Sequence, residues 1–266
     1  MAENHETGEA ETGRHIVDQL IAERAPRLTR NPLWPLLRPG LYALLGYDDA
    51  RAMADEIARM GGYEALDHVS DRLDLDLRCT ALNAVPAEGA CLIVCNHPTG
   101  VADGVALYDA LKARRPDLCF FANYDALRVC PGLEEAVTPV VWPPEARTLE
   151  SSKETLRQAK QALGEKRAIV IFPSGVVARM RKGRLRDEPW EATPVTLSRK
   201  HGVPIVPAAL SGPYSRLFNW FDRISSELRD VTVFHELLNK AGQCYSVRFA
   251  EPVDPEEFED ADDETI

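Results

Sequence analysis

Two ionisable residues in the first half of the sequence have the types and the spacing for base catalysis. They lie in the segment Asn96-His-Pro-Thr-Gly-Val-Ala-Asp-Gly104, in which His97 and Asp103 are six positions apart. A loop that turns at Pro98 and Gly100 brings the imidazole and the carboxylate within hydrogen-bonding reach. The carboxylate would then fix the imidazole tautomer and stabilise its protonated form, as a general base requires. The simpler alternative is a turn histidine next to an aspartate that caps a helix.

A second polar cluster ends the segment Ala168-Ile-Val-Ile-Phe-Pro-Ser-Gly-Val-Val-Ala-Arg179. An apolar run stops here at a turn that contains proline and glycine. We expect the main-chain N–H groups of this turn, with Ser174 and Arg179, to hold an anionic headgroup or a developing oxyanion. Ser174 does not lie in a G-x-S-x-G motif, so we do not interpret it as a nucleophile. The alternative is an ordinary turn between a strand and a loop.

A basic run follows directly on this turn. Its five cations, within eight residues, are Arg179, Arg181, Lys182, Arg184 and Arg186. The run holds no acid, whereas residues 1–12 hold four acids and residues 251–266 hold nine. We predict that these cations contact an anionic headgroup, the phosphate groups of a ligand or an anionic membrane surface. The alternative is a solvated charged face.

Both polar clusters follow apolar runs that are typical of buried strands. Such runs occur at 90–95, 118–122, 137–142, 168–172, 203–210 and 245–250, and helical patterns occur between them at 104–114, 149–163 and 191–201. This alternation predicts an α/β domain with a mostly parallel sheet flanked by helices. Ligands of such sheets bind at the carboxyl ends of the strands, where both clusters lie.

The N-terminal part of the chain has helical rather than alternating patterns. Apolar positions recur at helical spacing in 15–24, 48–60 and 63–72. We predict a flexible acidic tail at 1–13, a helical N-terminal region at 14–74, a main domain at 75–258 and a second acidic tail at 259–266. The segment 31–46 is rich in leucine and tryptophan. It either inserts into one membrane leaflet or covers the α/β core, and the sequence leaves both open.

Composition narrows the cellular setting. The mean hydropathy is −0.26, and the chain has no run of the roughly 20 apolar residues that a transmembrane helix needs. The polar start predicts that no secretory signal is present. Six cysteines without a C-x-x-C pair indicate a reduced environment and no zinc site. We therefore expect a cytoplasmic protein, peripheral on the inner face of the membrane, with no metal and no nucleic-acid partner.

The motifs together resemble those of the lysophospholipid acyltransferase-like superfamily, which contains the glycerolipid acyltransferases. That superfamily has N-H-x4-D, F-P-E-G and V-P-[IV]-[VI]-P motifs, and this chain has His97 and Asp103, Phe172-Pro-Ser-Gly175 and Val203-Pro-Ile-Val-Pro207. The chain is most similar to a branch named after hemolysins that includes lyso-ornithine-lipid O-acyltransferases. That branch adds a D-x-x-W step and an N-K-x-G pattern, present here as Asp187-Glu-Pro-Trp190 and Asn239-Lys-Ala-Gly242.

The resemblance implies a glycerolipid acyltransferase-like fold and direct transfer of a fatty acyl group to the hydroxyl of a lysolipid. The donor would be an acyl thioester, acyl-CoA or acyl carrier protein, used as a co-substrate without any cofactor. His97 would act as the base and Asp103 would orient it. The implied substrate-binding residues are Asn96, Gly100, Phe172, Pro173, Ser174, Gly175 and Arg179.

The chain departs from the general superfamily pattern at two points. The histidine and the aspartate are separated by five residues, and Gly100 would absorb the extra one. Ser174 stands where the superfamily has glutamate, and Val177 where it has an arginine that helps to bind the acceptor phosphate. These changes leave acyl transfer plausible and the acceptor unidentified. Two alternatives stay open: an acyl-thioester hydrolase that uses the same pair, and a non-catalytic lipid-binding relative.

Overall fold

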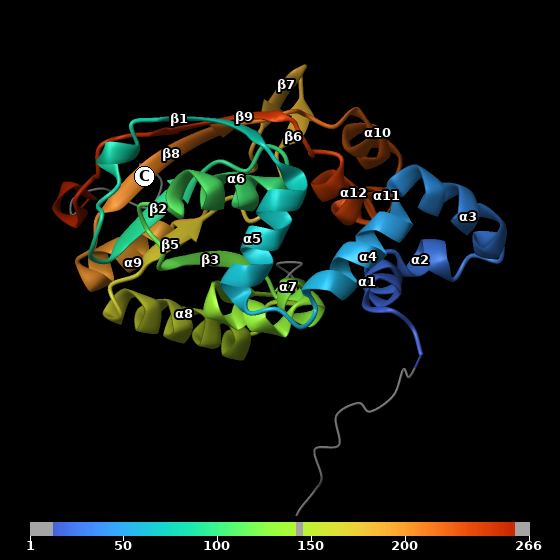
Figure 1. Ribbon diagram of the computed structural model, residues 1–266, viewed down its shortest axis with the longest axis horizontal. Helices are drawn as coiled ribbons and strands as arrows, with labels where there is room; N and C mark the ends of the chain where they lie inside the picture. Colours follow the sequence, from blue (N-terminus) through green and yellow to red (C-terminus); the bar gives the residue numbers. More distant parts are fainter. Residues whose placement is uncertain (1–12, 142–145, 259–266) are drawn as a thin grey trace, which may run out of the picture.

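The computed structural model describes residues 13–141 and 146–258. Nearly all of the two predicted acidic tails, and the end of the strand expected at 137–142, lie outside the described residues. In Figure 1 the sheet and its covering helices lie on one side of the molecule and the first helices on the other. Of the helices in the described ranges, none is both long and apolar enough to cross a membrane.

In the described part of the chain, seven strands form one sheet in the order β1-β9-β8-β2-β5-β3-β4. Their bounds are β1 Asp76–Thr80, β2 Cys91–Cys95, β3 Leu118–Asn123, β4 Val137–Val140, β5 Ala168–Ile171, β8 Ile205–Ser211 and β9 Cys244–Phe249. Neighbouring strands pair in parallel except β8 and β9, which are antiparallel. The predicted α/β class with a mostly parallel sheet flanked by helices is therefore confirmed.

The central strand β2 shows why this sheet needs helices on both faces. All five of its residues are buried, and alternate side chains enter different cores. Ile93 packs in the cluster under α5 (Gly62–Leu73) and α6 (Val101–Leu111), whereas Leu92 packs in the cluster under α8 (Leu149–Gly164) and α9 (Thr193–His201). Side chains of a strand point to alternate faces, so a strand that is apolar at every position is buried on both faces.

The N-terminal region is helical, as predicted from its pattern. It contains α1 (Ile16–Arg24), α2 (Pro26–Thr29), α3 (Trp34–Leu45), α4 (Tyr47–Ile57) and α5. A third apolar cluster joins α1, α3 and α4 to α10 (Arg216–Ile224) and α11 (Ser226–Asp230), which come some 180 residues later in the chain. The short helices α7 (Asp125–Val129) and α12 (Val233–Leu238) lie between the helices of this third cluster and the sheet (Figure 1).

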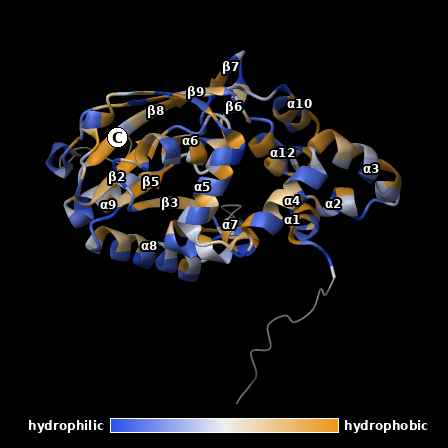
Figure 2. Ribbon diagram, viewed as in Figure 1, coloured by the Kyte–Doolittle hydropathy of each residue, from blue (hydrophilic) through white to orange (hydrophobic). Residues whose placement is uncertain are grey.

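The segment 31–46 does not cover the α/β core, because its buried side chains lie in the third apolar cluster, and its insertion into a membrane leaflet stays a prediction. It forms α3, on which Trp34 and Leu45 are buried in the third cluster. Leu36, Leu37 and Leu44 on the same helix are exposed, by 79%, 52% and 53%. In Figure 2, α3 lies at the end of the molecule farthest from the sheet. One face of α3 therefore covers protein, and the other presents leucine side chains to the surroundings.

The basic run forms a small hairpin outside the main sheet. Its strands are β6 (Arg179–Arg181) and β7 (Arg184–Arg186), paired antiparallel with Arg179 opposite Arg186. Lys182 and Gly183 form the two-residue turn, with φ of 49° and 75°. Positive φ at both central positions is typical of the hairpin turn whose twist matches that of the strands. We name this unit the basic hairpin, and Figure 1 shows it above the sheet.

The strand β1 was not expected from the sequence, because it has no apolar run. Four of its five residues are exposed, and it is held at the edge of the sheet by parallel pairing with β9. That pairing consists of main-chain hydrogen bonds, which leave no side-chain pattern in the sequence. The same holds for the antiparallel direction of β9 next to β8.

Candidate active site

The His97 side chain lies just beyond the carboxyl end of the central strand β2. Its Nδ1 atom is 2.8 Å from Oδ2 of Asp103, which stands in the first turn of α6. The Asp103 side chain is fully buried, whereas 17% of the His97 side chain is exposed. The structure thus brings together the two residues predicted as the base and its carboxylate partner.

Several donors fix the Asp103 carboxylate. Its Oδ2 atom accepts hydrogen bonds from the N–H groups of Thr99 (2.8 Å) and Gly100 (3.1 Å), and its Oδ1 atom accepts one from the Thr99 hydroxyl. The Tyr245 hydroxyl, from β9, lies 2.7 Å from the Thr99 hydroxyl. Since the carboxylate only accepts, His97 donates through Nδ1, and Nε2 is the nitrogen left to take a proton.

Gly100 gives the loop the shape that the longer histidine-to-aspartate spacing requires. It has φ of 106° and ψ of −146°, a conformation that side chains with a Cβ rarely adopt. A Cβ placed there would be 3.7 Å from Val177 Cγ2, so the dihedral angle rather than lack of space demands glycine. This turn lets the first turn of α6 deliver Asp103 back to His97.

The turn after β5 lies beside the His97 loop because β5 is the parallel neighbour of β2. The Phe172 ring is stacked on the His97 ring, with centroids 4.3 Å apart and planes 25° apart. Gly175, with φ of 64°, closes the turn by donating its N–H to the Phe172 carbonyl. The Ser174 hydroxyl donates to the Val176 carbonyl at 2.8 Å, so it is engaged inside the turn.

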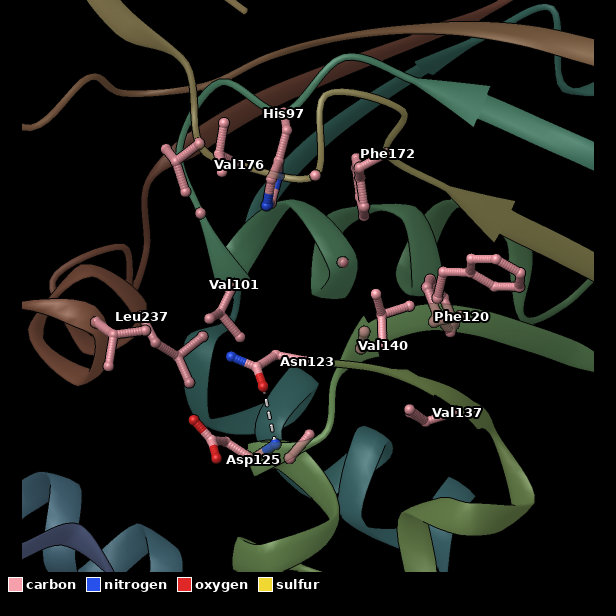
Figure 3. Close-up of a pocket in the computed structure, with 18 of the residues that line it drawn as sticks. His97, Val101, Phe120, Asn123, Asp125, Val137, Val140, Phe172, Val176 and Leu237 are labelled. Carbon is pink, nitrogen blue, oxygen red and sulfur yellow. Dashed lines mark hydrogen bonds between the residues drawn. The ribbon is translucent and has the colours of Figure 1, made fainter. Parts of the chain in front are cut away.

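A cavity of about 630 Å³ opens under His97 and is lined mainly by apolar side chains. Figure 3 shows the His97 ring pointing into it, with Phe172 beside the ring and Val101 below. Phe120 from β3, Val140 from β4 and residues of α5 form its deeper wall. Its volume is in the usual range for a small-molecule site, roughly 300–1,000 Å³. We name it the apolar cavity.

A second, open cleft of about 1140 Å³ adjoins the apolar cavity, with which it shares Arg179 and other lining residues, and most of its lining residues are charged or polar. We name it the polar cleft. Arg24 contacts Asp125 at 2.7 Å, and Arg229 contacts Asp230 at 2.7 Å. Arg179 lines both hollows. Its Nη1 atom lies 3.7 Å from Oε1 of Glu188, and its Nε atom lies 3.9 Å from Oδ1 of Asp222. These distances exceed those of direct hydrogen bonds, so the Arg179 guanidinium keeps donors for a ligand.

The predicted substrate-binding residues divide into two groups. His97, Gly100, Phe172, Pro173, Gly175 and Arg179 line the apolar cavity. Ser174 lines the polar cleft instead. Asn96 lines neither, since its side-chain amide donates to the Leu210 carbonyl at 2.8 Å and accepts from the Leu210 N–H at 2.7 Å. Asn96 therefore ties the end of β2 to β8, and its predicted contact with substrate is untested.

The outer residues of the basic hairpin are not brought into either hollow. Arg181, Lys182, Arg184 and Arg186 are exposed and absent from the lining of both. Arg181 contacts Glu188 at 3.1 Å. Their predicted contacts with a headgroup or a membrane stay predictions.

Cys95, two residues before His97, does not compete for the role of nucleophile. It is fully buried in the core, and burial raises the pKa of its thiol far above the usual range. The reactive form of cysteine is the thiolate, which this environment disfavours.

Two residues that support the site, Thr99 and Tyr245, were not predicted from the sequence. Thr99 links Asp103 to Tyr245, whose phenol pKa is raised by burial, so the hydroxyl stays neutral. Gly212 makes room for the ring, since a Cβ there would lie 2.4 Å from Tyr245 Cε1. Tyr245 is 146 residues from Thr99, and no local pattern signals such a contact.

Comparison with known proteins gives one family match and two curated relatives. The family model for acyltransferases matches residues 76–211, slightly more than half of the chain. A lyso-glycine lipid O-acyltransferase of Phocaeicola vulgatus is 26% identical over 179 residues, which cover 67% of this chain and 62% of the relative. A protein of the same name from Bacteroides thetaiotaomicron is 21% identical over 249 residues, which cover 91% of this chain and 89% of the relative. The first match thus spans a little under two thirds of that relative.

The fold is also found among solved structures. One example is the 1-acyl-sn-glycerophosphate (LPA) acyltransferase PlsC from Thermotoga maritima, with a TM-score of 0.51. The similarity covers 92% of this chain and 91% of that one at 16% sequence identity. At this identity the similarity concerns the fold alone.

Proposed function

The chain belongs to the acyltransferase family, and we propose that it is an O-acyltransferase that moves a fatty acyl group from an acyl thioester to the hydroxyl of a lysolipid. The glycerolipid acyltransferase superfamily predicted from the motifs is confirmed by the family match. One observation carries the proposal. A histidine held by a buried carboxylate presents its second nitrogen to a cavity that is apolar on one side and adjoins a charged cleft on the other.

In the proposed reaction, His97 acts as a general base on the acceptor. Its Nε2 takes the proton of the acceptor hydroxyl while the hydroxyl oxygen attacks the carbonyl carbon of the thioester. Asp103 stabilises the imidazolium through Nδ1. When the tetrahedral intermediate collapses, the carbon–sulfur bond breaks and the leaving thiolate takes the proton from His97. The products are an ester and a free thiol, and no acyl-enzyme is formed.

We assign stabilisation of the oxyanion to the main chain after the turn that follows β5. Val176 and Val177 line the apolar cavity, and Figure 3 shows Val176 next to His97. Among the described residues, none accepts a hydrogen bond from either of these N–H groups. Fixed N–H donors that face the reacting carbonyl are worth several kcal/mol in acyl transfer.

The two hollows suit the two halves of an acylated substrate. The apolar cavity would hold a fatty acyl chain, since its walls offer mostly carbon surface. The polar cleft would hold the headgroup of the acceptor, with Arg179 at the junction. The relatives are named lyso-glycine lipid O-acyltransferases, and a carboxylate headgroup would suit a bidentate contact with Arg179. A lyso-glycine lipid is therefore the first acceptor to test.

We further propose that the protein works on the inner face of the membrane as a peripheral protein. The exposed leucines of α3 would enter the acyl region of one leaflet, and the exposed cations of the basic hairpin would meet anionic headgroups. All six cysteines are free thiols, which suits the reducing side of a membrane.

Donor consumption by the purified protein, measured with and without a lysolipid acceptor, tests the proposal. The expected result is a new ester, formed only when acyl thioester and lysolipid are both present. The inactive variant is His97→Ala, and the matched control is His201→Ala, at the end of α9 and outside both hollows. Equal release of free fatty acid with and without acceptor would instead identify a thioester hydrolase. Lipid binding without any turnover would identify a non-catalytic relative.

A further inference from the structure

The main chain of His97 is held from two sides by the two ends of the basic hairpin. The His97 carbonyl accepts a hydrogen bond from the N–H of Ala178 at 2.8 Å. The His97 N–H donates to the Asp187 carboxylate, at 3.3 Å from Oδ1 and 3.4 Å from Oδ2. Ala178 directly precedes β6, and Asp187 directly follows β7. The residues at the two ends of the hairpin therefore bind the main chain of His97 on both sides.

The Asp187 carboxylate is itself held in place by the residues that follow it. The indole Nε1 of Trp190 donates to Asp187 Oδ2 at 3.0 Å. The N–H of Glu191 donates to the Pro173 carbonyl at 3.0 Å, which ties this segment to the turn after β5. The D-x-x-W step thus has a physical explanation, because three residues of separation let the indole reach the carboxylate.

His97 needs such support because it lies beyond the sheet. The pairing of β2 ends at Val94 with β5 and at Cys95 with β8, and the side chain of Asn96 makes the last contact with β8. None of these bonds involves the main chain of His97. Asp103 holds the imidazole at one nitrogen only. The position of Nε2 also depends on the main chain, and a misplacement of about 1 Å can cost about 10²-fold in rate.

We propose that Asp187 is a positioning residue for acyl transfer, whose carboxylate fixes the His97 peptide while Trp190 fixes the carboxylate. Asp187 lines neither hollow, so it acts through His97 and not on the substrate. The inference rests on the proposed role of His97 as the base. The hairpin would then position the catalytic base, in addition to any contact of its cations with lipid.

A merely structural role for Asp187 makes a different prediction. The hairpin has a second anchor, since the N–H of Met180 donates to Asn219 Oδ1 on α10 at 3.0 Å. Asn219 does not contact His97 and lines neither hollow. If the hairpin only needs to be attached, loss of either anchor affects the protein in the same way. If Asp187 positions the base, only its loss lowers kcat.

The test compares four variants of the full chain with the wild type: Asp187→Ala, Asp187→Asn, Trp190→Phe and Asn219→Ala. For Asp187→Ala we expect kcat to fall about 10–100-fold while both KM values change little. Asp187→Asn should recover part of the rate, because its amide oxygen still accepts from His97 N–H. Trp190→Phe should cost less than Asp187→Ala. Asn219→Ala should lower the melting temperature and leave kcat near the wild-type value.

A second measurement does not depend on activity. Exchange of the His97 amide hydrogen, followed by NMR with isotopically labelled histidine, should be faster in Asp187→Ala than in the wild type. If the wild type transfers no acyl group, the proposed function fails. The exchange measurement still tests whether Asp187 holds the main chain of His97. The inference would be overturned if the folded Asp187→Ala variant kept the wild-type kcat or the wild-type exchange rate at His97. It would also be overturned if Asn219→Ala lost as much kcat as Asp187→Ala.

Discussion

The loop after β2 and the basic hairpin both carry ionisable residues, but those of the loop are mostly buried and those of the hairpin are mostly exposed. In the loop, Asp103 is fully buried, and its two oxygens accept from the side chains of His97 and Thr99 and from two main-chain N–H groups. In the hairpin, Lys182, Arg184 and Arg186 project from a two-stranded unit and are exposed. The first region is a closed hydrogen-bond network, and the second is a charged surface.

This difference predicts how each region responds to mutation. A buried network depends on geometry, because a buried donor or acceptor that loses its partner has no water to replace the lost hydrogen bond. Exposed cations act through their field, so each contributes little and salt weakens all of them. We therefore expect large effects on the chemical step from the loop, and smaller, salt-dependent effects on binding from the hairpin.

The largest effect should come from His97→Ala. Loss of a positioned general base typically costs about 10²–10⁴-fold in rate. Because the ring projects into the apolar cavity rather than into the core, the variant should keep its fold. The measurement is kcat for ester formation together with thermal unfolding. Near-wild-type transfer by the folded variant would refute the mechanism.

Asp103→Asn should come next, with a loss of about 10²-fold or more in kcat. The amide brings an N–H group into a place where every neighbour donates, so it disturbs the network and no longer fixes the Nδ1–H tautomer of His97. The KM values should change much less than kcat. Thr99→Val, which removes the hydroxyl but keeps the main-chain donor, should retain more activity than Asp103→Asn. The reverse order would show that the Thr99 hydroxyl matters more than the carboxylate charge.

Arg179→Ala should have an intermediate effect, because this residue belongs to both regions. It begins the hairpin yet lines the apolar cavity and the polar cleft. A charge-assisted hydrogen bond contributes about 1.5–3 kcal/mol, so we expect the acceptor KM to rise about 10–100-fold. The donor KM should hardly change. A selective rise in the donor KM would instead place the acyl carrier at Arg179.

The smallest effect for each residue should come from neutralising Arg181, Lys182, Arg184 and Arg186. Each change should weaken binding to anionic vesicles by about 1 kcal/mol, and the loss should shrink in high salt. A matched control neutralises four exposed cations on and next to α8, namely Lys153, Arg157, Lys160 and Lys166. Equal vesicle binding by both variants and the wild type would show that the hairpin cations only face solvent.

Much of the site was predictable because its parts are local in sequence. His97 and Asp103 belong to one loop, and the residues at 172–175 belong to one turn. The apolar runs before them are typical of buried strands, and parallel strands bring their carboxyl ends to one edge of the sheet. The predicted strands at 90–95 and 168–172 are indeed neighbours in the sheet.

The residues that hold this site were not predictable in the same way. Tyr245 reaches Thr99 from β9, and Asp187 reaches the main chain of His97 from 90 positions away. The motif that contains Asp187 was visible in the sequence, but nothing in its spacing indicates what the carboxylate binds. The packing of α1 and α4 against α10 and α11 was equally hidden.

The sequence by itself determined the α/β class, the loop that pairs a histidine with an aspartate, and the turn that lies beside it. These features follow from short-range periodicity, from the special dihedral angles of glycine and from the order of strands along the chain. Only the tertiary structure decided which distant side chains support His97, how the two hollows meet at Arg179, and which face of α3 stays exposed. These contacts depend on main-chain pairing and on packing between segments far apart in sequence, which no single segment encodes.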